Sequence, residues 1–372
     1  MPVRDAVNVD LSESGTFNSR HGFTSVVAGT RIRSGYSVDD FGALVANGAD
    51  LSKFDGSTLT KIADLGSPYG RVSYADTQNG IVWSDGLKIG VVRNWTNTSL
   101  APNTPNPLPQ VQVITGGSFP EGNYQISYAA QMADGRRSPM SFPVEIYIPV
   151  NGRLSITMPA QPYPVHVFLT PPNGSTFFRV GSFSSGSLIV GSSNTSGEGV
   201  RFEVEEVIPP CRVLGFHNGR ILAAIGGLLI YSKAYSSLYR PASDFIPFPS
   251  DIRLIASVAS GVFIATEKAT HFIAVDINEG TLTDVATFGA TDGTLVSLPN
   301  STDLMWFTPR GQVRVTQDGS FTLLQDKQIQ FPNSAVGAAM FRETDGARQY
   351  VATLANPVPS GSAVARSFFE LE

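Results

Sequence analysis

The sequence predicts an all-β protein with a propeller-like body and a second β-domain inserted into it. Short apolar segments rich in β-branched and aromatic residues recur along the chain, as at 80–83, 221–225 and 261–266. Asn-Gly and Asp-Gly dipeptides separate many of these segments, and both accept the positive φ that tight hairpins require. Helical periodicity is nearly absent. Together these observations predict antiparallel sheets built from short hairpins.

A loose repeat indicates the propeller. A turn, an apolar strand, a second turn and another strand recur at intervals of roughly 30–50 residues, the length of one four-stranded blade. The repeats span residues 38–64, 70–95, 211–233, 251–276, 293–317 and 335–356. A single blade cannot bury both of its faces, so we expect the blades to stack around an axis. A pair of packed sheets is the alternative arrangement of the same strands.

Three aromatic residues are expected inside this body. Trp83, Phe263 and Trp306 each lie within an apolar strand next to a turn. Replacing such a residue by alanine should therefore leave a cavity in a packed core.

The regular spacing breaks between residues 101 and 210. Residues 101–109 (APNTPNPLP) are proline-rich and predict a stiff, extended linker, and Pro209-Pro210 closes the segment. Six or seven short strands in about 100 residues are typical of an immunoglobulin- or fibronectin-type β-sandwich. The predicted domains are therefore 1–100 and 211–372 for the two parts of the body, and 101–210 for the inserted domain. Residues 110–208 are expected to fold alone.

Composition narrows the classes of function. Charged residues are 15% of the 372, below the usual share of about 25%. A neutral surface suits contacts with other proteins, although a β-rich chain with many neutral turns has the same composition. The net charge of −5 argues against an exposed nucleic-acid-binding surface, which needs basic stripes.

Cysteine content and the length of apolar runs bear on the cellular compartment in which the protein is expected. Cys211 is the only cysteine, so neither an intramolecular disulfide nor a cysteine metal site is expected, and its apolar surroundings predict a buried packing thiol. No apolar run is long enough for a membrane span, and the N-terminus lacks the apolar core of a signal peptide. We expect the protein to be made in a cytoplasm and to leave it, if at all, by lysis or within a particle.

Residues able to support catalysis are few and scattered. His21, His166, His217 and His271 do not stand at metal-ligand spacings. No nucleophile elbow, phosphate loop or dinucleotide fingerprint is present. Glu203, Glu205 and Glu206 cluster, and strand alternation places Glu203 and Glu205 on one solvated face. We therefore predict no catalytic, cofactor-binding or metal-binding residues, no cofactor, and a protein that is not an enzyme.

Two turns weakly resemble the Asp-box turns of sialidase propellers. They lie at 74–83 and 316–321, and the spacing departs from the Asp-box pattern in both. Asp-box turns are structural even in sialidases, so the similarity favours a propeller. A sialidase-like hydrolase is the most distant of the alternatives.

Several segments carry a more specific resemblance. Residues 3–11 (VRDAVNVDL), followed by 15–23 (GTFNSRHGF), resemble the opening of many bacteriophage tail structural proteins. Residues 217–222 (HNGRIL), leading to IYSK, YRP and FIPFP at 230–249, resemble a second stretch of the same proteins. Residues 341–354 are similar to their C-terminal blade. The resemblance covers most of the chain and is to the nozzle, or tail tubular, proteins of short-tailed phages.

This resemblance implies a structural virion protein of a phage tail. Nozzle proteins are propeller-based, carry inserted β-domains and form a ring through which DNA leaves. It implies a homo-oligomeric ring in the virion tail that joins other tail proteins, such as the portal adaptor, fibres or tail tip, and through which DNA passes transiently and non-specifically. A receptor- or glycan-binding tail module is the alternative. A conduit should not retain DNA, so we expect lumen-facing loops to be acidic or neutral.

One loop bears on assembly. Three tyrosines and then three prolines recur along it without a helical or strand period: Tyr231, Tyr235, Tyr239, Pro241, Pro247 and Pro249. Tyrosine is enriched at protein interfaces. The loop is expected either to pack across the end of the propeller or to anchor a neighbouring subunit.

Overall fold

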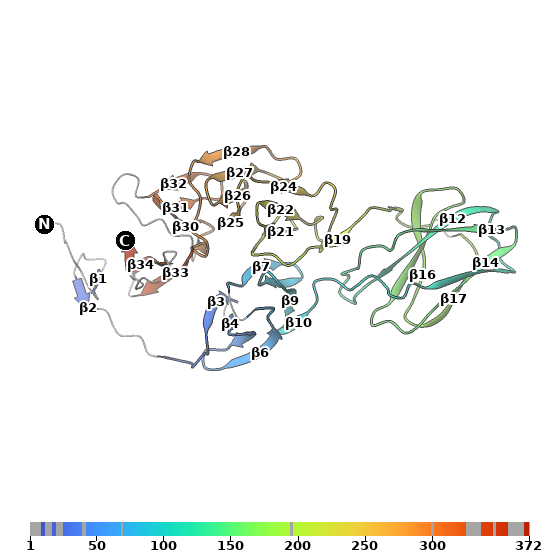
Figure 1. Cartoon of the computed structure of the whole chain (residues 1–372), viewed down its shortest axis with the longest axis horizontal. Helices are drawn as coiled ribbons and strands as arrows, with labels where there is room; N and C mark the ends of the chain where they lie inside the picture. The colour runs from blue at the N-terminus through green and yellow to red at the C-terminus, as the bar shows by residue number, and fades with distance from the viewer. Residues whose placement is uncertain are drawn as a thin grey trace, which may run out of the picture.

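The protein is all-β, as predicted. A computed structural model describes residues 9–11, 17–19, 25–38, 42–67, 70–193, 196–298, 301–324, 336–344, 347–355 and 368–371. Within these ranges the chain forms strands and turns but no helix. The described residues accordingly include no helix that could cross a membrane. Figure 1 shows a body of several small sheets, with a second unit projecting from it.

Six antiparallel sheets, here called blades 1 to 6, form the propeller-like body. Blade 1 contains β3 (Ile32–Ser37), β4 (Ala43–Asn47), β5 (Asp50–Phe54) and β6 (Leu59–Asp64). Blade 2 contains β7 (Ser73–Thr77), β8 (Gly80–Ser84), β9 (Ile89–Arg93) and β10 (Thr96–Thr98). Blade 3 contains β20 (Val213–His217), β21 (Arg220–Ile225), β22 (Leu228–Tyr231) and β24 (Phe245–Pro247).

The remaining blades follow in chain order. Blade 4 contains β25 (Ile252–Val258), β26 (Gly261–Thr266), β27 (Thr270–Ala274) and β28 (Leu282–Ala286). Blade 5 contains β29 (Val296–Ser297), β30 (Leu304–Thr308), β31 (Gly311–Val315) and β32 (Phe321–Leu323). Blade 6 has three strands, β33 (Val336–Thr344), β34 (Ala347–Ala355) and β35 (Phe368–Leu371). A short pair, β1 (Val9–Leu11) and β2 (Phe17–Ser19), precedes blade 1. Each of the six predicted repeats falls in a separate blade.

The turn dipeptides close the hairpins as the sequence suggests. At Asn218-Gly219, between β20 and β21, both residues adopt positive φ, 46° and 78°. This is the type I′ geometry that matches the twist of two paired strands. The ring of Tyr235 lies against Gly219, where an added Cβ would come within 2.9 Å of it. A glycine is therefore required there by conformation and by space.

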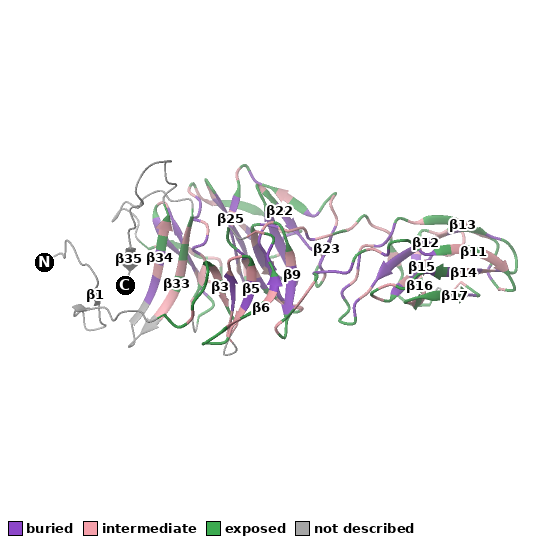
Figure 2. Ribbon diagram, turned by 60° about the horizontal axis from the view of Figure 1, so that its bottom comes forward, coloured by how far each residue is buried: buried purple, intermediate pink, exposed green. Residues whose placement is uncertain are grey.

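The cores of the body lie between blades rather than within them. Alternate residues of one strand face opposite neighbours. In β26, Val262 and Ile264 pack against blade 3, whereas Phe263 and Ala265 pack against blade 5. Because both faces of such a strand are buried, its sequence is a continuous apolar run rather than an alternating one. Figure 2 shows buried residues through the middle strands of the blades.

The predicted aromatic core residues are confirmed. Trp83 lies between blades 1 and 2, and Phe263 and Trp306 lie between blades 4 and 5. All three are buried, and Trp306 is 0% exposed. The rings of Phe263 and Trp306 have centroids 6.0 Å apart. Burying a large apolar side chain contributes about 1.5–3 kcal/mol, so these contacts are a major source of blade-to-blade stability.

Residues between blades 2 and 3 form two further sheets. One contains β11 (Gln110–Thr115), β14 (Gly152–Met158) and β17 (Gly186–Val190). The other contains β13 (Val144–Ile148), β12 (Gly122–Ala130), β15 (Val165–Leu169), β16 (Thr176–Phe183) and β18 (Val200–Arg201). We call this unit, residues 110–201, the inserted domain. Its assignment to the immunoglobulin or fibronectin class stays a prediction.

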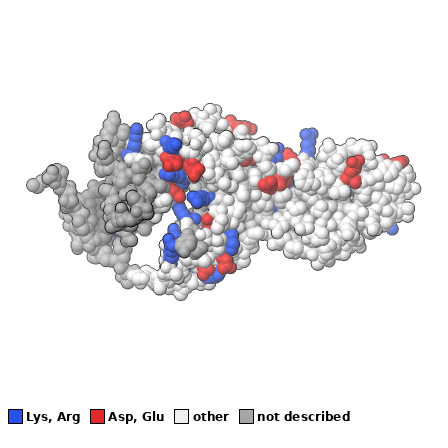
Figure 3. Space-filling model, in the orientation of Figure 1, with Lys and Arg blue, Asp and Glu red and all other residues white. Residues whose placement is uncertain are grey.

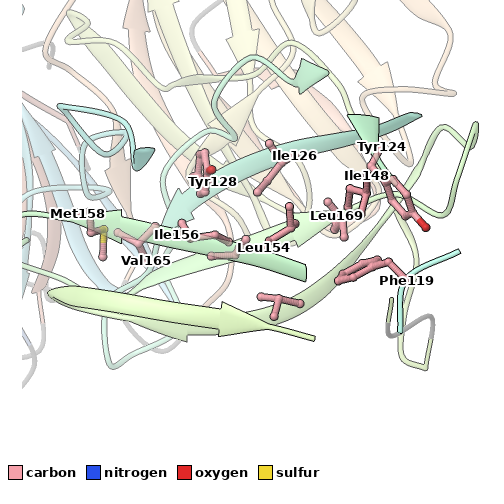
Figure 4. Packing of buried hydrophobic residues seen from close by; sticks show 12 residues of the cluster. Phe119, Tyr124, Ile126, Tyr128, Ile148, Leu154, Ile156, Met158, Val165 and Leu169 are labelled. Atoms are coloured by element: carbon pink, nitrogen blue, oxygen red, sulfur yellow. The ribbon is translucent and has the colours of Figure 1, made fainter. Parts of the chain in front are cut away.

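The two sheets of the inserted domain share one hydrophobic core (Figure 4). Tyr124, Ile126 and Tyr128 of β12 point into it from one sheet, and Leu154 and Ile156 of β14 from the other. Between the buried residues of β14 stand partly or fully exposed ones, so the strand follows the alternating pattern of a sheet with one wet face.

Candidate functional site

The histidines do not converge. On β20, His217 has its two ring nitrogens 2.8 Å from Ser257 Oγ and 2.8 Å from the Val275 carbonyl oxygen. His271 Nδ1, on β27, lies 2.6 Å from Asp284 Oδ1. His166 is half-buried on β15, where burial first and the charge of Arg179 second lower its pKa. His21 lies outside the described residues. No group of three potential metal ligands occurs in the described part of the chain.

Cys211 is a packing residue, as predicted. It is buried in the cluster between blades 2 and 3, and its backbone N–H donates to Ser84 Oγ at 2.9 Å. Burial raises the pKa of the thiol to about 12. The group is therefore protonated at neutral pH and is a poor nucleophile.

A hollow lies where the blades meet, and we call it the channel. Its volume is about 430 Å³, and residues from all six blades or the segments leading into them line it. Four arginines, here called the channel arginines, stand near the start of the first strand of blades 1 to 4: Arg33, Arg71, Arg212 and Arg253. Asp76 and Asp292 are the acidic residues of the described lining. The lining is thus rich in positive charge, although the whole chain is acidic.

Two of the channel arginines lie at the same level because the first strands of blades 2 and 3 are in register. The Leu214 N–H on β20 donates to Ser73 Oγ on β7 at 2.9 Å. Arg71 and Arg212 each stand two residues before the residues of that contact. In blade 4, Arg253 stands two residues before Ile255, against which Gly215 of blade 3 packs closely. Arg71, Arg212 and Arg253 therefore lie near one mouth of the channel.

The four guanidinium groups differ in the number of hydrogen bonds and ion pairs that they make within the chain. Arg33 donates to the carbonyl oxygens of Gly48 (2.9 Å), Ser67 (2.5 Å) and Gly70, so it fixes loops of blade 1. Arg71 Nη1 lies 3.3 Å from Asp292 Oδ1, which precedes blade 5.

The other two channel arginines, Arg253 and Arg212, lie in blade 4 and just before blade 3. Arg253 pairs with Glu267 at 3.3 Å within blade 4. Arg212 is exposed, and its side chain has no hydrogen bond or ion pair to any residue that the structure describes. The mouth is therefore surrounded by two arginines with one ion pair each, Arg71 and Arg253, and by Arg212, which has none among the described residues.

Neutral polar contacts join neighbouring blades along the wall. Ser34 Oγ of blade 1 lies 3.2 Å from Tyr74 Oη of blade 2, and burial raises the pKa of Tyr74 to about 12. The Gly337 N–H of blade 6 donates to the Asp292 carbonyl oxygen at 2.7 Å. These contacts hold Asp292 and the first strands in place. The described lining contains no histidine or cysteine; it contains serine and tyrosine hydroxyls, and its charged groups are four arginines and two aspartates.

A second polar cluster joins the inserted domain to blade 3. We call it the junction network; it contains Arg137, Glu203, Glu205, Lys233 and Arg240. Lys233 Nζ lies 2.5 Å from both Glu203 Oε2 and Glu205 Oε1. Arg137 of the inserted domain pairs with Glu205 at 3.0 Å, and Arg240 of blade 3 pairs with Glu203 at 3.1 Å.

The prediction that Glu203 and Glu205 lie on one solvated face is wrong for Glu205. Its side chain is only 3% exposed, because Arg137 and Lys233 cover it. Both glutamates lie on one side, since both pair with Lys233, but they stand between β18 and β19 rather than in a strand, so strand alternation does not apply to them. A hydrogen bond from Lys233 is the main cause that lowers the pKa of Glu203.

The aromatic–proline loop packs mainly within the chain. Tyr231 and Tyr239 are buried, and Tyr239 Oη donates to Glu206 Oε2 at 2.7 Å. Strand β23 (Leu238–Tyr239) pairs with β19 (Glu206–Val207), the last strand before the chain re-enters the body. Tyr235, in contrast, is 74% exposed. The loop thus covers the junction, and one tyrosine remains on the surface.

Exposed apolar side chains gather along one edge of the inserted domain. β13 is the edge strand of its sheet and pairs only with β12. Along and beside this strand, Phe142, Val144, Tyr147 and Val150 are all more than half exposed. We call these four residues the β13 strip. The inserted domain carries little charge on the face that Figure 3 shows.

The channel arginines and the junction network were not found from the sequence. Both depend on contacts between distant segments, such as Arg71 with Asp292, 221 residues apart. A signal for the channel arginines does exist: an arginine stands at or just before the first strand in four successive repeats. Aligning the repeats on their first strands would have shown it.

Comparisons with known proteins do not assign a family. Neither a protein-family model nor a curated protein sequence matches the chain. Among solved structures, the chain is similar to BBS1N in complex with ARL6DN, at 11% identity over 90% of this chain and 93% of that one, with a TM-score of 0.38. It is also similar to PorZ of Porphyromonas gingivalis, at 12% identity over 96% and 55%, with a TM-score of 0.25.

A third similar structure is the AfRom2 CNH domain, at 9% identity over 82% of this chain and 83% of that one, with a TM-score of 0.28. None of the three is described as a phage tail protein. At such TM-scores these similarities carry no argument about this chain. The propeller-like description therefore rests on the six sheets, the cores between them and the channel that they share.

Proposed function

We propose that the chain is a structural component of a bacteriophage tail that acts by assembling with other chains. The observation that carries this proposal is the β13 strip, an apolar edge on a domain that projects from the body. Edge strands present unpaired backbone groups, and natural proteins usually protect them with charge or a covering element. β13 carries one exposed charge, Glu145, but exposed Phe142, Val144 and Tyr147 outnumber it, and such an edge is suited to a protein contact.

The resemblance to nozzle proteins supplies the biological setting. Its second stretch, at 217–249, forms blade 3 and the loop that holds the inserted domain. We infer that the inserted domain is a β-sandwich arm, and that several copies of the chain form a ring with other tail proteins around it. His217, His271 and Glu205 make contacts within the chain, which is compatible with a structural role.

The DNA conduit in this proposal is the lumen of the ring, not the channel within one chain. A channel of about 430 Å³ is the size of a small-molecule pocket. The lumen would be lined by loops of several copies, which we expect to be acidic or neutral so that DNA is not retained. Locating the chain in intact particles by electron cryo-microscopy tests this. A position away from the tail axis would contradict the conduit role and favour receptor binding.

Assembly itself is tested with the purified full chain. Sedimentation should show an oligomer whose population falls when Val144→Glu places a charge on the β13 strip. Val26→Glu is the matched control, because Val26 is also more than half exposed but lies outside the inserted domain, in the segment that precedes blade 1. A monomer at all concentrations, or equal loss of the oligomer in both variants, would show that the strip is not the contact.

A hollow beside Trp95 favours receptor or glycan binding as the second candidate. It has a volume of about 320 Å³ and is lined by Val38, Ile81, Val92, Asn94 and Trp95. Lys53 Nζ lies 4.5 Å from the centre of the Trp95 ring. An aromatic ring beside an amide is a common arrangement for a ligand with apolar and polar faces. Screening glycans against the full chain and its Trp95→Ala variant tests this, and absence of Trp95-dependent binding counts against it.

A further inference from the structure

We propose that the channel arginines form a binding site for a small ligand that carries two or more phosphate or carboxylate groups. The site lies at the mouth of the channel, between blades 2, 3 and 4. Arg212 and Arg71 are its principal contacts and Arg253 adds charge. This inference goes beyond the proposed function and holds whether or not the chain belongs to a tail.

The side chain of Arg212 is exposed at the channel and has no hydrogen-bond or ion-pair partner among the residues that the structure describes. A guanidinium group offers five donors in a planar fork that matches the geometry of carboxylate and phosphate oxygens. Arg212 therefore has its full donor capacity available for a ligand.

Arg71 is only weakly paired within the chain. One contact of 3.3 Å joins it to Asp292, and the side chains of both residues are over one third exposed. Exposed pairs of this kind contribute little to stability, so a ligand can compete for the arginine at small cost. Asp292 is held by its backbone contact with Gly337, and it thus acts as a built-in competitor for the anion site.

The position of the arginines also suits one shared ligand. Ser73 and Leu214 hold the first strands of blades 2 and 3 in register, which sets Arg71 and Arg212 at one level. The channel beside them is concave and has a volume of about 430 Å³, within the usual range for small-molecule sites. A concave wall with a low dielectric strengthens the attraction of several like charges for one polyvalent anion. A single phosphate could satisfy one arginine, whereas a ligand with two charged groups could satisfy both.

Isothermal titration of the full chain with pyrophosphate and, separately, with citrate tests this inference. We expect saturable binding of at least one of them that weakens as salt is raised. Pyrophosphate binding alone would assign the site to phosphate ligands, and citrate binding alone to carboxylate ligands. Each outcome supports the site. Absence of binding by both at millimolar concentration would overturn it.

Three variants decide whether the arginines are responsible. Arg212→Ala should weaken binding about ten- to a hundredfold, because hydrogen bonds between charged groups are lost. Asp292→Asn should strengthen binding about three- to fivefold, since it removes the competing carboxylate. Arg179→Ala is the matched control: Arg179 is also exposed, but it lies on β16 of the inserted domain. It should leave binding unchanged.

The result that would contradict the assignment is equal weakening by Arg212→Ala and Arg179→Ala, because this would indicate attraction by net charge alone. Unchanged affinity in Arg212→Ala would also overturn it. Replacing an exposed arginine is not expected to unfold the protein. Thermal melting of each variant checks that it is folded. Loss of the anion site would leave the sedimentation test of assembly untouched, so the two proposals fail separately.

Discussion

The body and the inserted domain bury their apolar residues in different ways. In the body, each described core cluster lies between two neighbouring blades, and the central strand of a blade serves both neighbours. In the inserted domain, one cluster lies between two sheets of the same unit. A blade therefore depends on the blades beside it, whereas the inserted domain contains both halves of its own core. The same strand chemistry gives mutually dependent blades in one case and a unit with its own core in the other.

The largest expected effect comes from isolating one element of each region. Residues 110–208 expressed alone should give a soluble β-domain with a cooperative thermal transition, because the core between its sheets is complete. Residues 211–249, which hold blade 3, should not fold alone, since both faces of β21 would be exposed. Far-ultraviolet circular dichroism during heating checks both. An unfolded inserted domain, or a cooperatively melting single blade, would contradict the comparison.

A substitution in one blade-to-blade core should come next in size. Trp306→Ala removes a fully buried ring between blades 4 and 5 and should lower the free energy of unfolding of the body by about 3–5 kcal/mol. The transition of the inserted domain should not move. Urea denaturation, with separate probes for the two regions, measures this.

The control for Trp306→Ala is Trp95→Ala, the same change at a tryptophan that is only partly buried, and it should cost much less. Trp306→Phe should cost less stability than Trp306→Ala. It keeps a ring and removes an indole N–H that is buried without a hydrogen-bond partner among the described residues. A near-neutral Trp306→Ala would show that blades 4 and 5 are not packed as described.

The smallest expected effect concerns the link between the two regions. The pKa of Glu203 is lowered by Lys233, so its contribution is fully present above the ordinary glutamate pKa of about 4.5 and is lost as the pH falls through the lowered value. Because Glu203 is one third exposed, we expect at most about 1 kcal/mol in docking free energy. Small-angle scattering should show a larger radius of gyration near pH 3 than at pH 7.

A matched pair of variants sharpens this prediction. Glu203→Gln should loosen the junction at pH 7. Asp64→Asn should not, although the pKa of Asp64 is likewise lowered by a lysine, because its partner Lys61 lies in blade 1. If the radius of gyration is independent of pH, or if both variants behave alike, the junction network does not hold the two regions together.

The sequence predicts those features that depend on neighbouring residues. Turn dipeptides and apolar runs locate the hairpins, and a run such as 261–266 is continuous because both faces of its strand are buried. The same reasoning failed at Glu205, because its local pattern is that of a wet strand face while Lys233 and Arg137 arrive from elsewhere in the chain. It also missed the pairing of Arg71 with Asp292. Long-range partners of polar residues leave no periodicity in the sequence.

The two points where the inserted domain leaves and rejoins the body have a consequence for how such a chain can change. Leu100 and Ile208 both lie in the cluster between blades 2 and 3, and these blades also contact each other directly, since the Leu214 N–H of β20 donates to Ser73 Oγ of β7. The cluster contains no residue of 110–201, so the contact between these blades does not depend on the fold of the inserted domain. A lineage of such proteins could exchange or remodel the domain at this position without altering the packing of the blades. The inserted domain could then change in evolution while the body stays the same.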